Sequence, residues 1–262
     1  MQCYMVDVFA DRRAHGNPAA VCVVEGEWPD DRLLMDIAFE NNAPVTAFLR
    51  TAEEGFDLRW FNLKHELELC GHATLGAAYV AMTYLKPGSC CAKLHTKGGL
   101  FRVHRDESGI YTMDFPSRRA KCCPKPELLE YALGAPVLKT FIARDLVAVV
   151  ENEDVVAHLR PDVPMFSQLR QCFGVIVTAK GRDCDFVSRF FSPLLATGTE
   201  DAVTAVAHST LIPFWSERLG KQEMIARQLS ARGGTIYCKN TCCTRVHIGG
   251  HVVTHSIGTI IL

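Results

Sequence analysis

Short stretches of alternating apolar and polar residues recur along this chain. Period-2 alternation with many β-branched and aromatic residues is typical of half-buried strands. The pattern predicts strands at residues 2–9, 19–24, 46–49, 56–61, 101–104, 111–115, 140–143, 146–150, 174–179, 184–191, 233–237, 245–248 and 252–255. Residues 30–41 instead carry apolar side chains at helical spacing, which predicts one amphipathic helix. The chain is therefore expected to be rich in strands.

Two longer segments, 70–85 and 201–219, stand apart because they are apolar on almost every face. A helix of that kind must be surrounded by protein. Each follows a predicted strand, so the simplest fold is α+β, with two similar halves that each wrap a curved mixed sheet around one buried helix. We expect this repeat in the structure and not in the sequence. Pro213 is expected to kink the second helix or to shorten its first part.

The boundary between the halves is expected in the segment 116–126, which combines basic residues, two cysteines and three prolines. This composition is typical of a linker. The sequence therefore predicts a first half over 1–116 and a second half that begins at residue 117.

Composition and charge exclude several classes of function. The 262 residues include 28 Lys or Arg and 29 Asp or Glu, so the net charge is −1. Binding to nucleic acid or to a membrane surface depends on an excess of cations, which this chain lacks. No apolar run approaches the roughly 18–20 residues that span a bilayer. The first residues do not resemble a secretory signal, so we expect a cytoplasmic protein.

Cysteine is frequent, with twelve residues that include three adjacent pairs. A reducing compartment and the absence of any Cys-x-x-Cys favour free thiols over disulfides or zinc. The densest group is Cys238, Cys242, Cys243 and His247. We expect these cysteines to behave as small buried hydrophobic residues, and we expect no bound metal.

The starts of the two buried helices are the best candidates for chemistry. Their first N–H groups have no intrahelical partner, and the helix dipole favours an anion there. Gly71 and His72 open the first helix, and Asp201 opens the second. His72 is either a general acid or base or a histidine that hydrogen-bonds to nearby backbone. Asp201 is either a helix N-cap or a proton carrier, and the two roles are compatible.

For each of three further residues, Asn17, Cys70 and His208, a structural role is the alternative to a functional one. The sequence Gly16-Asn17-Pro18 forms a tight turn or brings Asn17 into a cleft. Cys70 is a buried, inert thiol or a thiol activated by the helix start. His208, inside the second helix, is expected to be packed or hydrogen-bonded and not catalytic.

Four motifs, in order along the chain, resemble the phenazine-biosynthesis PhzF-like family. They are VDVFADRRAHGNPAAV, ELELCGHATLGAA, TEDAVTAVAHSTLIPFW and LSARGGTIYC. The resemblance implies the diaminopimelate epimerase-like fold, with two pseudo-symmetric halves and an active site between them. It implies that the chain end, about 255–262, returns to the first half, which leaves 117–254 for the second. It also implies a cofactor-free isomerase, often a homodimer, that moves a proton on a small carboxylated metabolite.

The resemblance also implies roles for individual residues. His72 matches the family histidine and Asp201 the family aspartate. Val45 stands where the family carries its catalytic glutamate, and Ala205-Val206 stands where the family has Gly-Ser. Valine has no proton to exchange, so it cannot replace a carboxylate base.

These matches and departures leave two principal hypotheses. In the first, the chain is an isomerase or epimerase in which His72 and Asp201 carry protons and line one cleft. Asn17, Gly71 and the amides of Ala205 and Val206 would then hold the substrate. In the second, the chain has lost catalysis and binds a small ligand. A third hypothesis, with Cys70 as the base, is weaker because no second cysteine lies near the aspartate.

Overall fold

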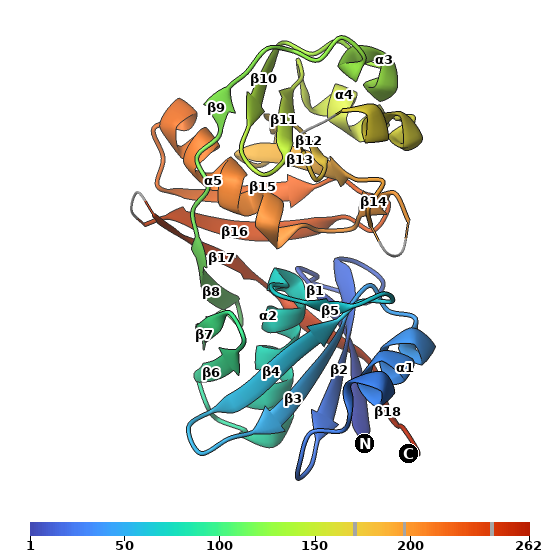
Figure 1. Cartoon of the computed structure of the whole chain (residues 1–262). Coiled ribbons are helices and arrows are strands. Elements are labelled where there is room, and N and C mark those ends of the chain that lie inside the picture. The colour runs from blue at the N-terminus through green and yellow to red at the C-terminus, as the bar shows by residue number, and fades with distance from the viewer. Residues whose placement is uncertain (170–171, 196–197, 242–243) are drawn as a thin grey trace. The chain divides into compact units, whose positions relative to one another are not determined.

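The chain forms two units, shown in the computed structural model of Figure 1. The structure describes residues 1–169, 172–195, 198–241 and 244–262. Unit 1 comprises 1–114 and 249–262, and unit 2 comprises 115–248. The chain end rejoins unit 1 at residue 249 and not at about 255, because β18 (Val252–Thr259) pairs with β1 (Gln2–Val8). No helix in the described part of the chain is long and apolar enough to span a membrane.

Unit 1 contains a mixed sheet. The β2–β3 and β4–β6 pairs are parallel, whereas β1–β2, β1–β18, β3–β4, β4–β5, β6–β7 and β7–β8 are antiparallel. The strands besides β1 and β18 are β2 (Asn17–Val24), β3 (Thr46–Thr51), β4 (Phe56–Phe61), β5 (Glu66–Leu67), β6 (Cys91–Thr96), β7 (Gly99–Arg105) and β8 (Tyr111–Pro116).

Two helices cover opposite faces of the unit 1 sheet. The amphipathic helix α1 (Asp31–Asn41) packs Leu34 and its apolar neighbours against alternate residues of β1, β2 and β3. The helix α2 (Gly71–Val80) lies on the other face and continues as a π-helical turn, η1 (Ala81–Leu85). All but one of the residues of α2 are buried, as its all-round apolar sequence predicts.

Unit 2 contains a second mixed sheet. The β11–β12 and β13–β15 pairs are parallel, and β9–β10, β10–β11, β12–β13, β13–β14 and β15–β16 are antiparallel. Its strands are β9 (Lys121–Cys122), β10 (Lys139–Ile142), β11 (Leu146–Val149), β12 (Val175–Lys180), β13 (Phe186–Phe191), β14 (Glu200–Asp201), β15 (Glu223–Gln228), β16 (Gly234–Asn240) and β17 (Arg245–Gly250).

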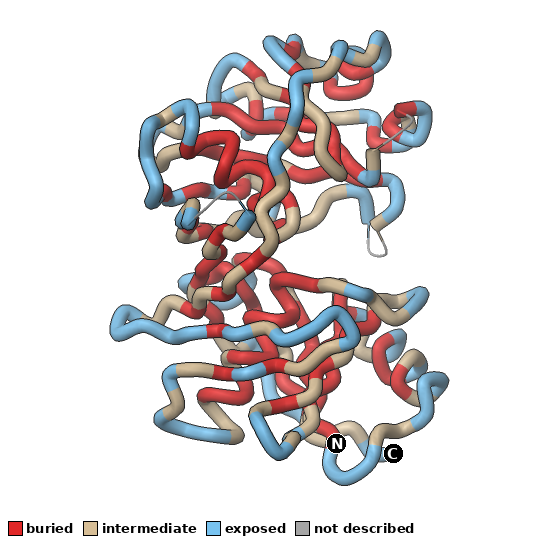
Figure 2. Tube along the Cα trace, turned by 60° about the vertical axis from the view of Figure 1, so that its left-hand side comes forward, coloured by how far each residue is buried: buried red, intermediate tan, exposed pale blue. Residues whose placement is uncertain are grey.

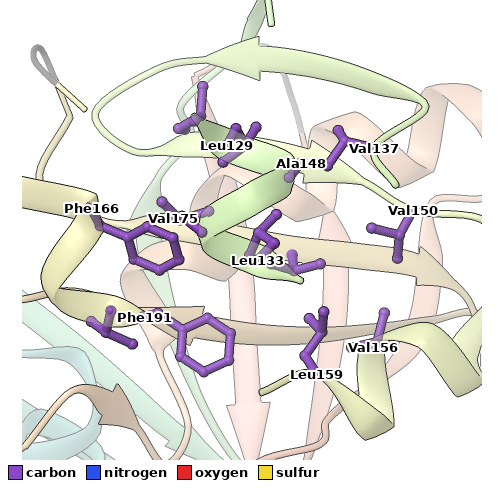
Figure 3. Packing of buried hydrophobic residues seen from close by; sticks show 14 of the residues in the cluster. Leu129, Leu133, Val137, Ala148, Val150, Val156, Leu159, Phe166, Val175 and Phe191 are labelled. Carbon is purple, nitrogen blue, oxygen red and sulfur yellow. The ribbon is translucent and has the colours of Figure 1, made fainter. Parts of the chain in front are cut away.

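Helices also cover both faces of the unit 2 sheet. On one face, α3 (Leu129–Leu133), α4 (Glu153–His158) and the 3₁₀ helix η2 (Val163–Gln168) pack their apolar side chains against strand residues (Figure 3). On the other face lies α5 (Ala205–Leu219), whose Trp215 donates from Nε1 to Thr178 Oγ1 at 3.0 Å. In both units the loops are largely exposed, while strands and helices carry the buried residues (Figure 2).

The two units repeat one plan of pairing. Counted from β1 in unit 1 and from β10 in unit 2, the first two strands are antiparallel, the second and third are parallel, and the third and fourth are antiparallel. The fourth strand then pairs with a two-residue strand, and after the buried helix it pairs in parallel with the next strand. By these registers β1 corresponds to β10, β4 to β13, β5 to β14 and α2 to α5.

A short sequence repeat accompanies this plan, contrary to our expectation of a repeat in structure alone. Strands β4 and β13 both have the form Phe-x-x-Arg-x-Phe. Arg59 binds both carboxylate oxygens of Glu66 at 2.8 and 2.9 Å. Arg189 likewise binds Glu200 at 2.7 and 2.8 Å. The repeated pair fixes the short strand that leads into each buried helix.

The segment 116–126 belongs to unit 2 and is not a free linker. Its strand β9 pairs with β10, and the N–H of Arg118 donates to the carbonyl of Ser209 at 3.0 Å. Ser209 lies four residues before Pro213, which has no N–H to donate to that carbonyl. The substitute donor explains why α5 continues through Pro213 to Leu219 and is not shortened there.

Candidate functional site

His72 is the second residue of α2 and is 8% exposed. The helix begins after Cys70, whose carbonyl accepts from the N–H of Thr74 at 3.1 Å and from its hydroxyl at 2.6 Å. The side chain of the N-cap residue Cys70 does not cap the helix. The imidazole Nδ1 lies 3.5 Å from Cys70 Sγ, and Nε2 is buried with no partner in the described residues.

Burial also decides the protonation of His72. It lowers the pKa of the imidazole to about 4, because the charged ring would lose its hydration. The backbone of Pro18 favours the charged ring and offsets a smaller part of this shift. The free protein therefore carries a neutral imidazole at pH 7.

Asn17 and Pro18 are the first residues of strand β2 and not part of a tight turn, and the backbone of Pro18 interacts with His72. The chain bends just before β2 at Gly16, which has φ +65°, and a Cβ there would meet the Val8 carbonyl oxygen at 2.2 Å. Asn17 follows directly and is 0% exposed. Unit 1 thus gathers Asn17, Pro18, His72 and its neighbour Gly71 in one region.

Val45 immediately precedes β3 and is buried. Its carbonyl accepts from the N–H of Ala20 in β2 at 3.1 Å, so the backbone is tied to the strand that Asn17 begins. The side chain offers neither a charge nor a proton at the position where the family resemblance expects a carboxylate.

Asp201 does not open α5, so its expected role as the helix N-cap is wrong. It lies in β14, opposite Phe190 of β13, and the N-cap is Thr204. The Thr204 hydroxyl donates to Asp201 Oδ2 at 2.7 Å. Asp201 lies in the sheet because β14 pairs with β13. Local sequence preferences do not predict this long-range pairing.

Gln228, a buried residue of β15, holds this arrangement from a distant part of the sequence. Its Nε2 donates to the Asp201 carbonyl at 2.7 Å, and its Oε1 accepts from the Thr204 N–H at 2.9 Å. Sequence reasoning missed both Gln228 and Thr204. A threonine directly before a long apolar run was a usable N-cap signal for Thr204, whereas nothing local marked Gln228.

Ala205 and Val206 are the first two residues of α5. The Thr204 side chain does not cap this helix, and the N–H groups of Ala205 and Val206 are among the first four, which have no intrahelical partner. Ala205 is buried and Val206 is half-buried. Unit 2 thus gathers Asp201, Thr204 and the open helix start, while the position of these residues relative to His72 stays a prediction.

His208 is packed inside unit 2, as expected. It is 0% exposed, its Nδ1 contacts the Thr204 carbonyl at 2.8 Å, and its ring stacks on Phe186 at 5.9 Å. Burial lowers its pKa to about 4. A histidine so enclosed serves the packing of α5.

The remaining candidates are the cysteines, as free thiols or as metal ligands. Ten cysteines are free thiols in the described residues, and Cys242 and Cys243 lie outside them. Among the same described residues, no group of three or more histidines, cysteines or carboxylates could hold a metal ion. Cys70 is buried beside His72.

Comparison with known proteins identifies the family. The family of phenazine biosynthesis-like proteins, PhzC-PhzF, matches residues 6–258. A Pseudomonas aeruginosa protein described as an uncharacterized isomerase is 41% identical over 260 residues, which cover 98% of this chain and 97% of that protein. The crystal structure of a PhzF family protein from Enterococcus faecalis has a TM-score of 0.95 and 38% identity, covering 100% of this chain and 99% of that one.

More distant structures share the fold. A hydroxyproline epimerase from Agrobacterium vitis has a TM-score of 0.65 at 11% identity, covering 98% of this chain and 91% of that one. The fold is thus α+β and diaminopimelate epimerase-like. From the match over nearly its whole length, this chain belongs to the PhzC-PhzF family of phenazine biosynthesis-like proteins, several of which are named isomerases.

Proposed function

We propose that this protein is a PhzF-like isomerase or epimerase that transfers a proton on a small carboxylated substrate without a cofactor. His72 and Asp201 are the groups that exchange protons with the substrate. The absence of a carboxylate at Val45 limits the rate.

The buried Nε2 atom of His72 carries this proposal. A buried nitrogen without a hydrogen-bond partner is costly, and such atoms in native proteins call for an explanation. A substrate that hydrogen-bonds to Nε2 supplies one. His208 has a similar unpartnered Nε2, but it is fully enclosed, whereas His72 is 8% exposed at the open end of its helix.

The helix starts favour a carboxylated substrate. The amides of Gly71 in unit 1 and of Ala205 and Val206 in unit 2 belong to uncapped helix ends, where partial positive charge favours a carboxylate. An anionic substrate next to His72 would also favour the charged imidazole and raise its pKa from about 4 toward neutrality. Substrate binding would thus prepare His72 for proton exchange.

Asp201 has the features of an oriented carboxylate. Its Oδ2 accepts from Thr204, and Gln228 fixes its backbone. A carboxylate held in one orientation can deliver or receive a proton at a defined atom when a substrate carbon lies within hydrogen-bond reach.

A second function is favoured by Val45 and Val206. Neither residue supplies the group that the family resemblance expects, and Val206 offers no hydroxyl to a ligand. In this alternative the protein binds a small carboxylated ligand and performs no chemistry on it.

Solvent-deuterium exchange separates the two functions. Small carboxylated metabolites are screened for thermal stabilisation of the protein, and each ligand that binds is incubated in deuterated buffer with the natural chain and with His72→Asn. The isomerase proposal predicts deuterium incorporation that His72→Asn lowers by roughly 10²-fold or more. Binding without incorporation supports the ligand-binding alternative.

Two further variants test the cost of the missing carboxylate. Val45→Glu alone, and together with Ala205→Gly and Val206→Ser, restores the residues that the family resemblance expects. General acid–base catalysis is worth about 10²–10⁴-fold, so exchange should rise by an amount in that range. If neither variant exchanges any ligand that binds, the proposed proton transfer is wrong.

A further inference from the structure

Cys3 and Cys22 lie directly opposite one another in unit 1. They are register partners in the antiparallel β1–β2 pair, and their Sγ atoms are 3.2 Å apart. Both side chains belong to the apolar cluster on the α1 face of the sheet.

The backbone geometry already suits a bond between these two thiols. Residues opposite one another in antiparallel strands have Cα atoms about 4.5–5.5 Å apart, which falls within the roughly 4.4–6.8 Å that a disulfide spans. The sulfur atoms need to approach by about 1 Å to reach a bonding distance near 2.05 Å. Side-chain rotation can supply that movement without a change of register.

The hydrogen bonds around the pair make the two thiols unequal. Cys22 donates to Cys3 Sγ, and Asn41 Nδ2 donates to Cys22 Sγ at 3.5 Å. The bond from Cys22 lowers the pKa of Cys3, and the same bond together with burial raises the pKa of Cys22. Cys3 is therefore the better nucleophile, because thiolate is the reactive form.

The exposure of the two side chains also favours reaction at Cys3 before Cys22. Cys3 is 7% exposed near the start of β1, while Cys22 is 0% exposed and lies two residues before the end of β2. A small oxidant can reach Cys3 before it reaches Cys22, and a bulky one is disfavoured at both.

We propose that Cys3 and Cys22 form an oxidative modification site, which a hydroperoxide converts into a cross-strand disulfide. Cys3 thiolate attacks the peroxide oxygen, the O–O bond breaks, and Cys3 becomes a sulfenic acid as the peroxide is reduced to water or an alcohol. Cys22 then gives up its proton and attacks Cys3 Sγ, which releases the sulfenic oxygen as water. The pair loses two electrons and two protons, and the peroxide gains them.

The corresponding positions of unit 2 show that the fold does not require this pair. By strand register Cys3 corresponds to Thr140 and Cys22 to Ala148, which are also opposite one another. A buried cysteine elsewhere, Cys238, lies opposite Met224 and not opposite a thiol in the described β15–β16 pair. Cys238 is therefore the internal control for non-specific oxidation.

Peptide mapping after peroxide treatment tests the proposal. The folded natural chain is treated with hydrogen peroxide, denatured, alkylated and digested, with and without prior reduction by dithiothreitol. The expected result is a linked pair of peptides containing Cys3 and Cys22, lighter by two hydrogen atoms, at a dose that leaves Cys238 fully alkylated. Dithiothreitol should return both thiols.

Two variants test whether the link requires Cys22 specifically. Cys22→Ser should abolish the link and leave Cys3 as a sulfenic acid that a dimedone probe traps, whereas Cys238→Ser should leave the link unchanged. The proposal is overturned if both thiols of the folded natural chain stay alkylatable while exposed cysteines oxidise, or if Cys3 pairs with another cysteine. Because no activity is measured, this result is independent of the proposed function.

Discussion

Units 1 and 2 share a scaffold but carry different chemical groups at matching positions. The arginine–glutamate pairs correspond, and counting on from Glu66 and Glu200 aligns Leu67 with Asp201, Gly71 with Ala205 and His72 with Val206. Each candidate proton carrier therefore corresponds by register to an apolar residue in the other unit. The comparison shows that pairing and ion pairs preserve the repeat, whereas the residues around each helix start are free to diverge.

The buried helices also fill their sheets differently. Helix α2 is built largely from glycine and alanine, and a Cβ on Gly76 would lie 3.0 Å from Val6 Cγ2. Helix α5 instead carries Phe214 and Trp215, and Trp215 stacks on Phe186 at 5.8 Å. In unit 1 the helix backbone lies close to the sheet, whereas in unit 2 large side chains fill the space between helix and sheet. Enlargement should therefore damage α2, and truncation should damage α5.

The largest expected effect is that of Trp215→Ala in α5. Removal of a buried tryptophan costs about 3–5 kcal/mol of unfolding free energy, because transfer and cavity terms add. It also leaves Thr178 Oγ1 without the indole donor. Urea unfolding measures the change, with Phe39→Ala as control because Phe39 is 64% exposed. Equal losses for the two variants would contradict the packing assigned to α5.

Acid should destabilise the protein through the histidines of both helices. Burial lowers the pKa values of His72 and His208 to about 4, so the unfolded chain, with values near 6.5, binds more protons. Stability should therefore fall as the pH drops from about 6.5 to about 4. A shift of this size is worth roughly 3 kcal/mol for each histidine.

Single variants separate the two contributions. His72→Asn and His208→Asn should each flatten the dependence of the unfolding free energy on pH in that window by a similar amount. The measurement is urea unfolding at pH 7.0, 5.5 and 4.5. If only His208→Asn flattens the curve, His72 is more hydrated in solution than its 8% exposure indicates.

Gln228→Ala should cost about 1–3 kcal/mol of stability, because it leaves the buried Thr204 N–H without its acceptor. Under the proposed function it should also slow deuterium exchange, since Asp201 loses its backbone support. Gln222→Ala is the matched control, because Gln222 is exposed. Loss of stability with unchanged exchange would remove Gln228 from the positioning of Asp201.

The smallest effect is expected for Gly76→Ala in α2. Alanine is favoured over glycine in a helix by up to about 1 kcal/mol, but the contact with Val6 opposes this gain. The net change in unfolding free energy should be within about 1 kcal/mol. A double-mutant cycle with Val6→Ala should show that the alanine is better tolerated when Val6 is small. Strict additivity would mean that α2 does not approach β1 as closely as the structure has it.

The sequence predicted the elements whose signals are local. Segments 70–85 and 201–219 were recognisable as buried helices because almost every face of each is apolar, although the second helix begins at Ala205 and not at Asp201. Strands β6 and β15 were missed although both alternate between buried and exposed residues, because their exposed positions include Lys93 and Glu223, residue types that are depleted in strands. The short helices α3 and α4 have too few turns to show a helical period.

The candidate site was predictable only in part, because its support comes from distant residues. His72 stands at a helix start that the sequence marks with Gly71. Asp201 was expected as an N-cap, but its pairing with Phe190 and the hydrogen bond from Gln228 place it in a strand. No local preference encodes a partner 27 residues away.

The pairing of β18 with β1 has a consequence for synthesis. Gln2 meets Thr259, and the Met1 amine donates to the Ile260 carbonyl at 2.9 Å, so unit 1 needs both ends of the described chain. Unit 2, residues 115–248, is contiguous. On the ribosome, unit 2 can therefore fold first, while β1 waits for β18, which is translated after all of unit 2. The nascent β1 edge needs protection from pairing with other chains during that interval.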